Sequence, residues 1–259
     1  MKERAQMNKD RRNEINSYIQ TKGEVTLNDL VKLYPEVSSM TIRRDLDYLE
    51  KQHEIIRTRG GAKSIAYLSS NLKEEKYLQK SLIHIEEKSL IARKAVKLIS
   101  PGRSIFLDAG TTIMTLAKLI PNERYYIFTS APDVAMEVLF STSSTVNLTG
   151  GEISRDNLVV CGAGAVEFMK NVNIDVAFIS VPGFSINNGF SCRDINDSQL
   201  KKAIIERAAK VVVLMDSSKI GINMPYTYAR FTDIDIIISD DKLPEKFRTE
   251  AEASGVTVL

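Results

Sequence analysis

The sequence predicts two domains, a small helical one at the N-terminal end and a larger α/β domain with a mostly parallel sheet. Between residues 8 and 51, apolar positions recur three and four residues apart, which is typical of helices. From about residue 104, short apolar runs alternate with helical stretches, the pattern of a parallel sheet covered on both faces. We expect the first domain over 8–63, a polar, lysine-rich linker over 64–87 and the second domain over 88–259.

The composition is that of an ordinary globular protein: 259 residues, 43% hydrophobic and 26% charged, with a net charge of +2. Its apolar runs fall short of the roughly 18 residues of a membrane span. The N-terminus also lacks the apolar core of a signal peptide. Cys161 and Cys192 form no CxxC pair, and His53 and His84 stand apart, which argues against a structural zinc site. We therefore expect a cytoplasmic protein with reduced thiols and with no membrane partner, metal or cofactor.

The charge is unevenly spread along the chain. Residues 1–65 hold 13 Lys and Arg against 10 Asp and Glu, whereas the remainder holds 22 against 23. A basic excess at one end is where a nucleic-acid partner would bind.

The first two helices have recognisable ends. A helix around Ile15 and Ile19 ends at Gly23. After a short extended piece, Thr26 and Asp29 are placed to form the capping box of a second helix. The apolar positions of this helix, and the proline that ends it, are Leu27, Leu30, Val31, Tyr34 and Pro35.

A third helix begins at Ser38 or Ser39 and runs to about Lys51. At 100° per residue, its core-facing positions are Ile42, Leu46 and Leu49. The opposite face and its flanks hold Met40, Thr41, Arg43, Arg44, Asp47 and Tyr48. Both arginines therefore project outward from the first two turns, as side chains do on a helix that reads the major groove of DNA.

A basic hairpin is expected after this helix. Ile55-Ile56 predicts a strand and Gly60-Gly61 a tight turn, so the segment can form a wing along the DNA backbone. Arginine can bond bidentately to guanine, and serine or threonine hydroxyls suit phosphate oxygens. The expected DNA contacts are Ser38, Ser39, Thr41, Arg43, Arg44, Arg57 and Arg59. The alternative is a plain three-helix bundle with a solvated basic face.

The stretch "VSSMTIRRDLDYLE", followed by "IIRTRGGA", resembles the winged helix-turn-helix of the DeoR family of bacterial transcriptional regulators. The similarity covers about residues 8–63. It implies that double-stranded operator DNA is the partner, and that the Arg43-Arg44 pair reads or grips it.

The second domain is expected to begin with the helix "EEKSLIARKAVKLISPG". The apolar runs that predict strands are Ser104–Leu107, Tyr125–Phe128, Thr145–Leu148, Val176–Val181, Val211–Met215 and Ile234–Ile238. Helical stretches near 112–120, 132–140, 162–171 and 196–209 separate them. Ligands of such sheets bind beyond the carboxyl ends of the strands.

Polar turns follow these strands. Glycine lets backbone N–H groups approach a ligand, hydroxyls add donors, and a helix N-terminus favours an anion. Lys219 would supply a point charge for a phosphate, and Asp108 could accept bonds from sugar hydroxyls. The turns that carry these groups are Asp108–Thr112, Thr129-Ser130, Thr149–Gly151 and Asp216–Lys219. Each turn alone could be ordinary turn chemistry, whereas their common position at one edge of the sheet favours a binding site.

The stretches "IFLDAGTT", "LTGGEIS", "VPGFSINNGF", "LKKAIIERA" and "VVVLMDSSKIG" resemble the DeoR-family sensor domain, whose fold is related to sugar-phosphate isomerases. The resemblance implies a phosphorylated sugar or a close metabolite as effector. Carried over by position, it implies Asp108, Gly110, Thr111, Thr112, Gly150, Gly151, Lys201 and Lys219 as ligand residues, and the strand-end argument adds Thr129 and Ser130. The chain departs from the family's frequent residues at Ser130, Asp197 and Lys80.

These observations favour a transcriptional regulator, most simply a repressor of a sugar-utilisation operon released by a phosphorylated sugar. One alternative is a sugar-phosphate isomerase with an appended DNA-binding module, in which Asp108 or Asp197 would be the base. A dinucleotide site at Cys161–Glu167 is rejected because Glu167 occupies the position of the third glycine. We expect a homodimer or homotetramer held together mainly by the second domain, because one winged helix contacts too few bases to be selective.

Overall fold

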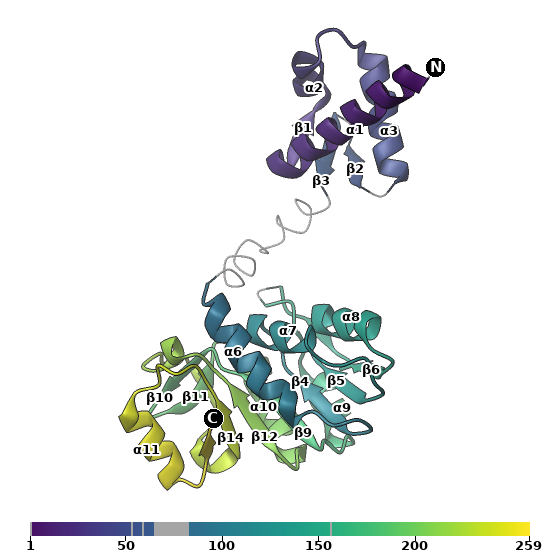
Figure 1. Cartoon of the computed structure of the whole chain (residues 1–259). Coiled ribbons are helices and arrows are strands. Elements are labelled where there is room, and N and C mark those ends of the chain that lie inside the picture. Colours follow the sequence, from purple (N-terminus) through teal and green to yellow (C-terminus); the bar gives the residue numbers. More distant parts are fainter. Residues whose placement is uncertain (1, 53, 59, 65–82, 156) are drawn as a thin grey trace. The chain divides into compact units, whose positions relative to one another are not determined.

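The computed structural model describes residues 2–52, 54–58, 60–64, 83–155 and 157–259. The chain divides into two compact units, residues 1–78 and 79–259 (Figure 1). Among the helices that the structure describes, none combines the length and apolar character needed to cross a bilayer.

The described part of the first unit contains three helices and a small antiparallel sheet of strand order β1-β3-β2. Its elements are α1 (Lys2–Lys22), β1 (Glu24–Thr26), α2 (Leu27–Leu33), α3 (Ser39–Lys51), β2 (Ile55–Thr58) and β3 (Gly61–Ser64). The core is formed by Ile15, Ile19, Val25, Leu30, Ile42, Leu46, Leu49, Ile55 and Ala62. The helical periodicity of the sequence therefore identified the buried faces of all three helices correctly.

The local signals at the helix starts are confirmed. The Thr26 backbone N–H donates to Asp29 Oδ2 at 2.9 Å, and the Asp29 N–H donates back to Thr26 Oγ1 at 3.2 Å. At Gly61 a Cβ atom would lie 2.0 Å from the Val25 carbonyl oxygen. Glycine is therefore required there for β3 to approach β1 closely enough to pair with it.

The second unit is built on a seven-stranded sheet of order β15-β14-β12-β9-β4-β5-β6, in which neighbouring strands run parallel. Its strands are β4 (Ser104–Leu107), β5 (Tyr126–Thr129), β6 (Thr145–Leu148), β9 (Val176–Ser180), β12 (Val211–Leu214), β14 (Ile236–Ile238) and β15 (Thr257–Val258). Its helices are α6 (Ile85–Ala95), α7 (Thr111–Ala117), α8 (Pro132–Ser141), α9 (Ala163–Lys170), α10 (Ile195–Arg207) and α11 (Glu245–Ala253).

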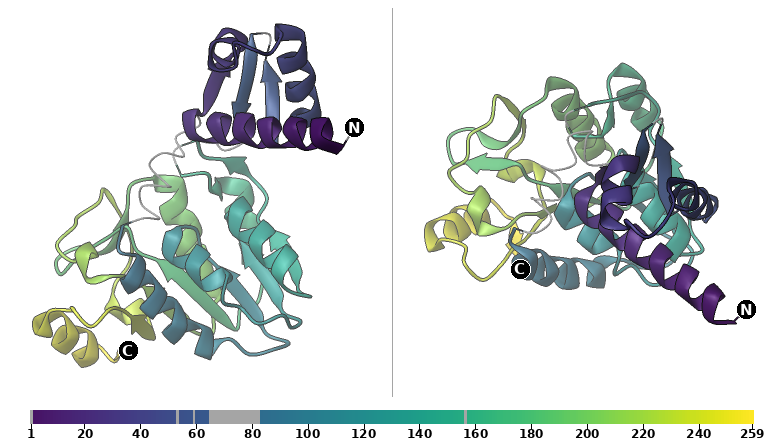
Figure 2. Two further views of the ribbon diagram at one scale, coloured as in Figure 1. Left: turned by 45° about the horizontal axis from the view of Figure 1, so that its top comes forward. Right: turned by 90° about the horizontal axis from the view of Figure 1, so that it is seen from above.

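Both faces of this sheet are covered, as the near-continuous apolar strands predict. Along β4, Ile105 and Leu107 pack into a core with α6, α7 and α8. Phe106 between them packs into a second core with α9, α10 and α11. The two groups of helices lie on opposite sides of the sheet in Figure 2.

Three features of the second unit were not expected from the sequence. Strand β15 extends one edge of the sheet, and a hairpin forms between β7 (Glu152–Ile153) and β8 (Val160–Cys161). A small antiparallel sheet contains β10 (Gly183–Ser185), β11 (Gly189–Cys192) and β13 (Tyr226–Ala229). These strands are too short to show a clear period of their own.

Candidate nucleic-acid interface and ligand site

Helix α3 begins with a hydrogen-bonded cap. Ser38 is the N-cap residue, and its hydroxyl accepts the Thr41 backbone N–H at 3.3 Å and lies 3.0 Å from the Thr41 hydroxyl. Ser39 is exposed in the first turn. The three hydroxyls therefore sit at the helix N-terminus, where unpaired N–H groups favour a phosphate.

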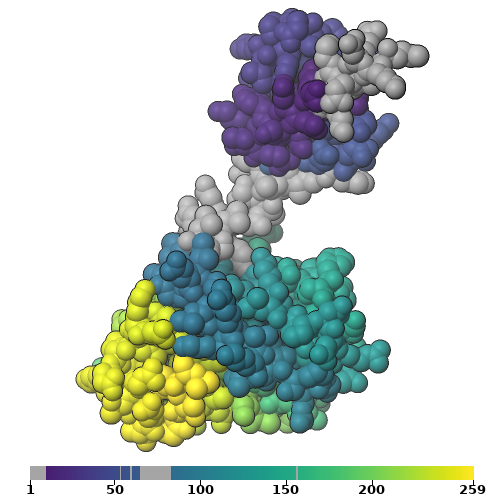
Figure 3. Space-filling model, viewed as in Figure 1, coloured from purple at the N-terminus to yellow at the C-terminus, as the bar shows by residue number. Residues whose placement is uncertain are grey.

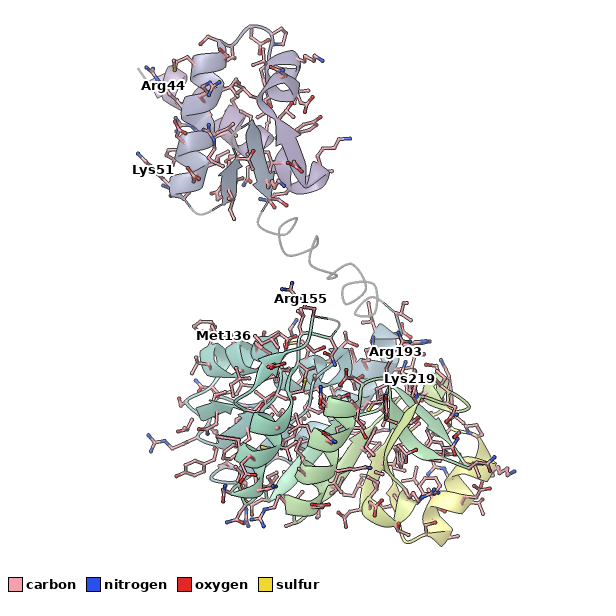
Figure 4. The ribbon with its side chains drawn as sticks, turned by 180° about the vertical axis from the view of Figure 1, so that it is seen from behind. Arg44, Lys51, Met136, Arg155, Arg193 and Lys219 are labelled. Atoms are coloured by element: carbon pink, nitrogen blue, oxygen red, sulfur yellow. The ribbon has the colours of Figure 1, made fainter. Side chains whose placement is uncertain are left out.

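The arginine pair lies on the solvent side of α3. Arg43 and Arg44 are exposed, while Ile42 and Leu46 beside them are buried. Figure 4 shows Arg44 projecting from the outer side of the first unit, with Lys51 further along the same helix. Removing either guanidinium would therefore leave the core contacts of α3 in place.

A buried carboxylate ties α3 to α1, a feature that the sequence analysis missed. Asp45 is 1% exposed, and its two oxygens accept the Nε–H of Arg11 at 2.7 Å and of Arg12 at 2.8 Å. The Arg12 guanidinium also lies 4.0 Å from the centre of the Tyr48 ring. The available signal was that Asp45 falls on the apolar stripe of α3, because a charge buried there needs a partner.

The wing is a β2-β3 hairpin, and Arg57 points back from it toward α3. Its Nη1 donates to Asp47 Oδ1 at 2.5 Å and to the Arg43 carbonyl oxygen at 3.2 Å. Its backbone N–H donates to Glu50 Oε1 at 3.1 Å. Arg57 thus fastens the wing to the helix that carries the arginine pair. Arg59 lies outside the described residues.

The polar turns predicted to bind a ligand all follow strands of the parallel sheet. Because parallel strands end at a common edge, these turns share the carboxyl edge of the sheet. The predicted ligand set is Asp108, Gly110, Thr111, Thr112, Thr129, Ser130, Gly150, Gly151, Lys201 and Lys219, of which Lys201 comes from α10.

A buried ion pair forms the centre of this edge. Lys201 Nζ donates to Asp108 Oδ2, although the residues are 93 positions apart. The same oxygen accepts the Ser180 backbone N–H at 2.9 Å and the Ser180 hydroxyl at 2.8 Å. Asp197 lies one helical turn from Lys201, with 3.8 Å between Oδ1 and Nζ. The arrangement holds an ammonium and two carboxylates in a protein interior, where their electrostatic interactions are strong.

Burial and the neighbouring charges together set the pKa values of Lys201, Asp197 and Cys192. Burial alone would lower the pKa of Lys201, but the carboxylates of Asp108 and Asp197 raise that pKa to about 12. Burial raises the pKa of Asp197, and the nearby Asp108 charge raises it further against the attraction of Lys201. The pKa of the Cys192 thiol is raised to about 12, chiefly by burial, so this thiol stays protonated and unreactive.

The turn after β4 leads into α7. Gly110 has φ of +112°, a conformation that favours glycine, and it is the N-cap residue of the helix. Thr111 and Thr112 follow in the first turn and are partly exposed. The first N–H groups of a helix have no partner within it, so this turn offers donors to a ligand.

Two hydroxyls at the ends of β5 and β6 are buried without partners. Ser130 is 1% and Thr149 2% exposed, and neither hydroxyl oxygen has a hydrogen-bond partner among the described residues. Gly151 follows with φ of +135°, and a Cβ there would lie 2.4 Å from the Cys161 carbonyl oxygen. A buried hydroxyl without a partner is costly, which favours a bound group at this position.

Lys219 lies at the end of the short 3₁₀ turn η3 (Ser217–Lys219) after β12. Its side chain is 32% exposed, and its Nζ lies 3.6 Å from Oδ2 of the buried Asp216. Asp240, after β14, accepts the Ser217 backbone N–H at 2.7 Å and so fixes the turn. Figure 4 shows Lys219 toward the same end of the unit as Arg155 and Arg193, two exposed arginines that the sequence analysis did not single out.

Two surface hollows lie away from the predicted ligand set. One is on the first unit and is lined by Glu14, Ser17, Tyr18, Thr21, Lys22 and Leu33. The other, on the second unit, is lined by Phe184, Ile186, Gly189, Arg230, Phe231, Thr232 and Ser254. Both lack the convergent buried charges found at the sheet edge.

Residues 11–67 match the family model of the DeoR-like helix-turn-helix domain, and residues 83–241 match that of the DeoR C-terminal sensor domain. The chain is also 34% identical over 223 residues to the HTH-type transcriptional regulator GlpR of Haloferax volcanii, covering 86% of each chain. The chain belongs to the DeoR family of transcriptional regulators. The resemblance of both domains to this family, expected from the sequence, is therefore confirmed.

A second DeoR-type relative is the glycerol-3-phosphate regulon repressor of Escherichia coli, 30% identical over 236 residues, covering 90% of this chain and 91% of the repressor. A solved ribose 5-phosphate isomerase from Methanocaldococcus jannaschii is similar with 18% identity and a TM-score of 0.39. That similarity covers 53% of this chain and 55% of the isomerase. The predicted fold class, a helix-turn-helix domain followed by a mostly parallel α/β domain, is confirmed by the structure and the family models.

Proposed function

We propose that this DeoR-family regulator represses a sugar-utilisation operon in the cytoplasm and leaves its operator DNA when a phosphorylated sugar binds the second unit. The exposed hydroxyls and arginine pair of α3 would contact the DNA. The carboxyl edge of the sheet would hold the effector, with its phosphate between Lys219 and the Thr111-Thr112 turn. The Escherichia coli relative is named as the repressor of a glycerol-3-phosphate regulon, and glycerol 3-phosphate is a phosphorylated polyol, which supports a small phosphorylated metabolite as effector.

The observation that carries the proposal is the chemistry of the sheet edge. A half-buried lysine, Lys219, follows β12 at this edge. The buried hydroxyls of Ser130 and Thr149, the start of α7 and the buried Asp108–Lys201 pair come from other elements at the same edge. Cations and N–H donors suit a phosphate, and carboxylates and hydroxyls suit sugar hydroxyls.

Lys219→Ala is expected to bind operator as tightly as the wild type but to stay bound when effector is added, because the effector's phosphate loses its cation. In cells this variant would repress permanently. Fluorescence anisotropy with duplexes selected from a random pool by the wild-type protein measures release. The probes are glycerol 3-phosphate, ribose 5-phosphate and glucose 6-phosphate. Lys170→Ala on α9, an exposed lysine paired with Glu167, is the matched control. Normal release from Lys219→Ala would place the phosphate elsewhere.

A sugar-phosphate isomerase is the second candidate, and Asp197 favours it, because burial raises the pKa of this carboxyl and so makes it a stronger proton acceptor when ionised. NMR of the same mixtures separates the two candidates. The regulator proposal expects release of DNA without conversion of the sugar phosphate. Turnover by the wild type that is lost in Asp197→Asn would establish the enzyme instead.

We also propose a homodimer or homotetramer, held together mainly by the second unit and binding half-sites a whole number of helical turns apart, about 34–36 Å each. One winged helix contacts too few bases to select a site in a genome. Light scattering of the free protein and of its DNA complex measures the mass. A single copy in both samples would contradict this proposal.

A further inference from the structure

A lysine on α6 is buried, although the sequence analysis assigned it no role. Lys88 is 6% exposed. It precedes Ile91, Ala92 and Ala95 by three, four and seven residues, so it belongs to the stripe that packs on the sheet. An ammonium in that position is costly unless polar groups compensate it. A methionine or leucine would pack there at no such cost, which suggests that the charge has a use.

The groups around Lys88 belong to the proposed phosphate site. Its Nζ donates to the Ile83 carbonyl oxygen at 2.5 Å. Burial lowers the pKa of Lys88, the Asp216 carboxylate opposes this, and the Lys219 ammonium lowers the pKa further. Asp216 in turn pairs with Lys219 at 3.6 Å. The Lys88 ammonium is therefore within electrostatic range of the Asp216–Lys219 pair.

The same lysine bonds to the first residue described after position 82, at the start of the second unit. Ile83 lies just before α6, where the described part of the second unit begins. Other contacts hold α6 to the body of the unit: Lys94 Nζ donates to the Ser239 carbonyl oxygen at 3.0 Å, and Lys242 Nζ donates to Glu87 Oε1 at 2.7 Å. In Figure 3 the α6 segment (blue) lies beside the C-terminal segment (yellow).

We propose that Lys88 is a second cation of the effector site, and that it passes effector binding at the end of β12 to the start of α6. This inference rests on the proposed function. A phosphate at Lys219 brings negative charge to a cluster in which Asp216 pairs with Lys219 and attracts the Lys88 ammonium. The Lys88 ammonium carries three donors, so it can turn toward the phosphate. Its bond to the Ile83 carbonyl then weakens, and the start of α6 changes position. Effector binding is coupled to the position of α6 because the effector binds more tightly when Lys88 is turned toward the phosphate.

The test uses the full chain and measures coupling separately from binding. Calorimetry gives the affinity for glycerol 3-phosphate, ribose 5-phosphate and glucose 6-phosphate, each with and without operator. The active probe is the sugar phosphate that releases DNA from the wild type. In the wild type, its affinity without operator should exceed its affinity with operator by about 5–150-fold, as for typical allosteric coupling. In Lys88→Met the ratio should fall below about threefold, with operator affinity unchanged within about twofold.

Two further variants make the test specific. Lys88→Gln can still donate to the Ile83 carbonyl but has no charge, so it should also lose coupling. It serves as the test if the methionine variant folds poorly. Lys94→Met removes a lysine of the same helix that bonds to Ser239, and it should keep wild-type coupling. Hydrogen exchange of residues 83–95 gives an independent measurement: the active probe should change it in the wild type and in Lys94→Met, but not in the Lys88 variants.

The outcomes separate this inference from the function on which it rests. If the wild type neither binds a probe nor releases DNA, the proposed function fails and the inference fails with it. If the wild type releases DNA and the Lys88 variants release it with the same coupling ratio, only the inference fails. Loss of coupling in Lys94→Met to the same extent would show a general requirement for an intact α6 and would also overturn it.

Discussion

Replacing Lys201 by Met is expected to lower the free energy of unfolding of the second unit by about 3–5 kcal/mol, the usual cost of removing one partner of a buried ion pair. Lys201 is 2% exposed, and its ammonium donates to Asp108, which is 1% exposed. Methionine fills a similar volume, so the loss is mainly electrostatic. The Asp108 carboxylate would keep the two donors of Ser180 but would lose its counter-charge.

Calorimetry of the full chain measures this effect, because the chain has no tryptophan to serve as a fluorescence probe. The transition of the second unit should move down by roughly 10 °C, given a shift of about 2–4 °C per kcal/mol for a domain of this size. The transition of the first unit is an internal control and should not move. Lys202→Met, at the exposed neighbouring position, is the matched variant and should change neither transition. Equal shifts in the two variants would contradict the assigned role of the pair.

The same pair predicts how the effect depends on pH. The pKa of Lys201 is raised from 10.5 to about 12 in the folded protein, so folding favours its protonated form. Its contribution to stability is therefore fully present below about pH 10.5 and is lost as the pH rises through about 12. The difference between wild type and Lys201→Met should stay constant from about pH 6 to 9 and should narrow above about pH 11.

Much of the fold could be predicted because its signals are local. Helix α3 shows its buried face in the spacing of Ile42, Leu46 and Leu49, and its cap in Ser38. The apolar runs of the parallel sheet are bounded by turn residues, and all of them became strands. The carboxyl-edge turns could also be placed, because parallel strands must end together.

The parts that could not be predicted depend on contacts between distant residues. The bond between Asp108 and Lys201 joins positions 93 residues apart, and neither side chain shows from its neighbours that it is buried. Arg57 was predicted to contact DNA, and that stays a prediction, but its bonds to Asp47 and to the backbone of α3 could not be seen from its alternation with Arg59. Lys88 was assigned no role, whereas it is buried and bonds to the Ile83 carbonyl oxygen. In each case tertiary packing decides the orientation, and a sequence pattern of one element cannot show it.

Arg43→Ala and Arg44→Ala are each expected to weaken operator binding by about 1–3 kcal/mol where the arginine makes a bidentate base contact. Where it contacts a phosphate instead, the slope of log affinity against log salt should fall by about one unit. Both side chains are exposed on the face opposite Ile42 and Leu46, so the fold should be unaffected. The double variant should bind more weakly than either single variant, and its circular dichroism spectrum should match that of the wild type.

The measurement is anisotropy across a range of salt concentrations, with the selected duplexes and with duplexes changed at single base pairs. An arginine that reads a base should lose discrimination at one base pair, while one that contacts a phosphate should weaken all duplexes alike. Lys51→Ala is the control, because Lys51 is an exposed cation in the last turn of the same helix, far from the N-terminal turns that enter the groove. If Lys51→Ala weakens binding and the arginine variants do not, α3 meets DNA through its other end. In that case the capped hydroxyls of Ser38 and Thr41 would have no DNA-binding role.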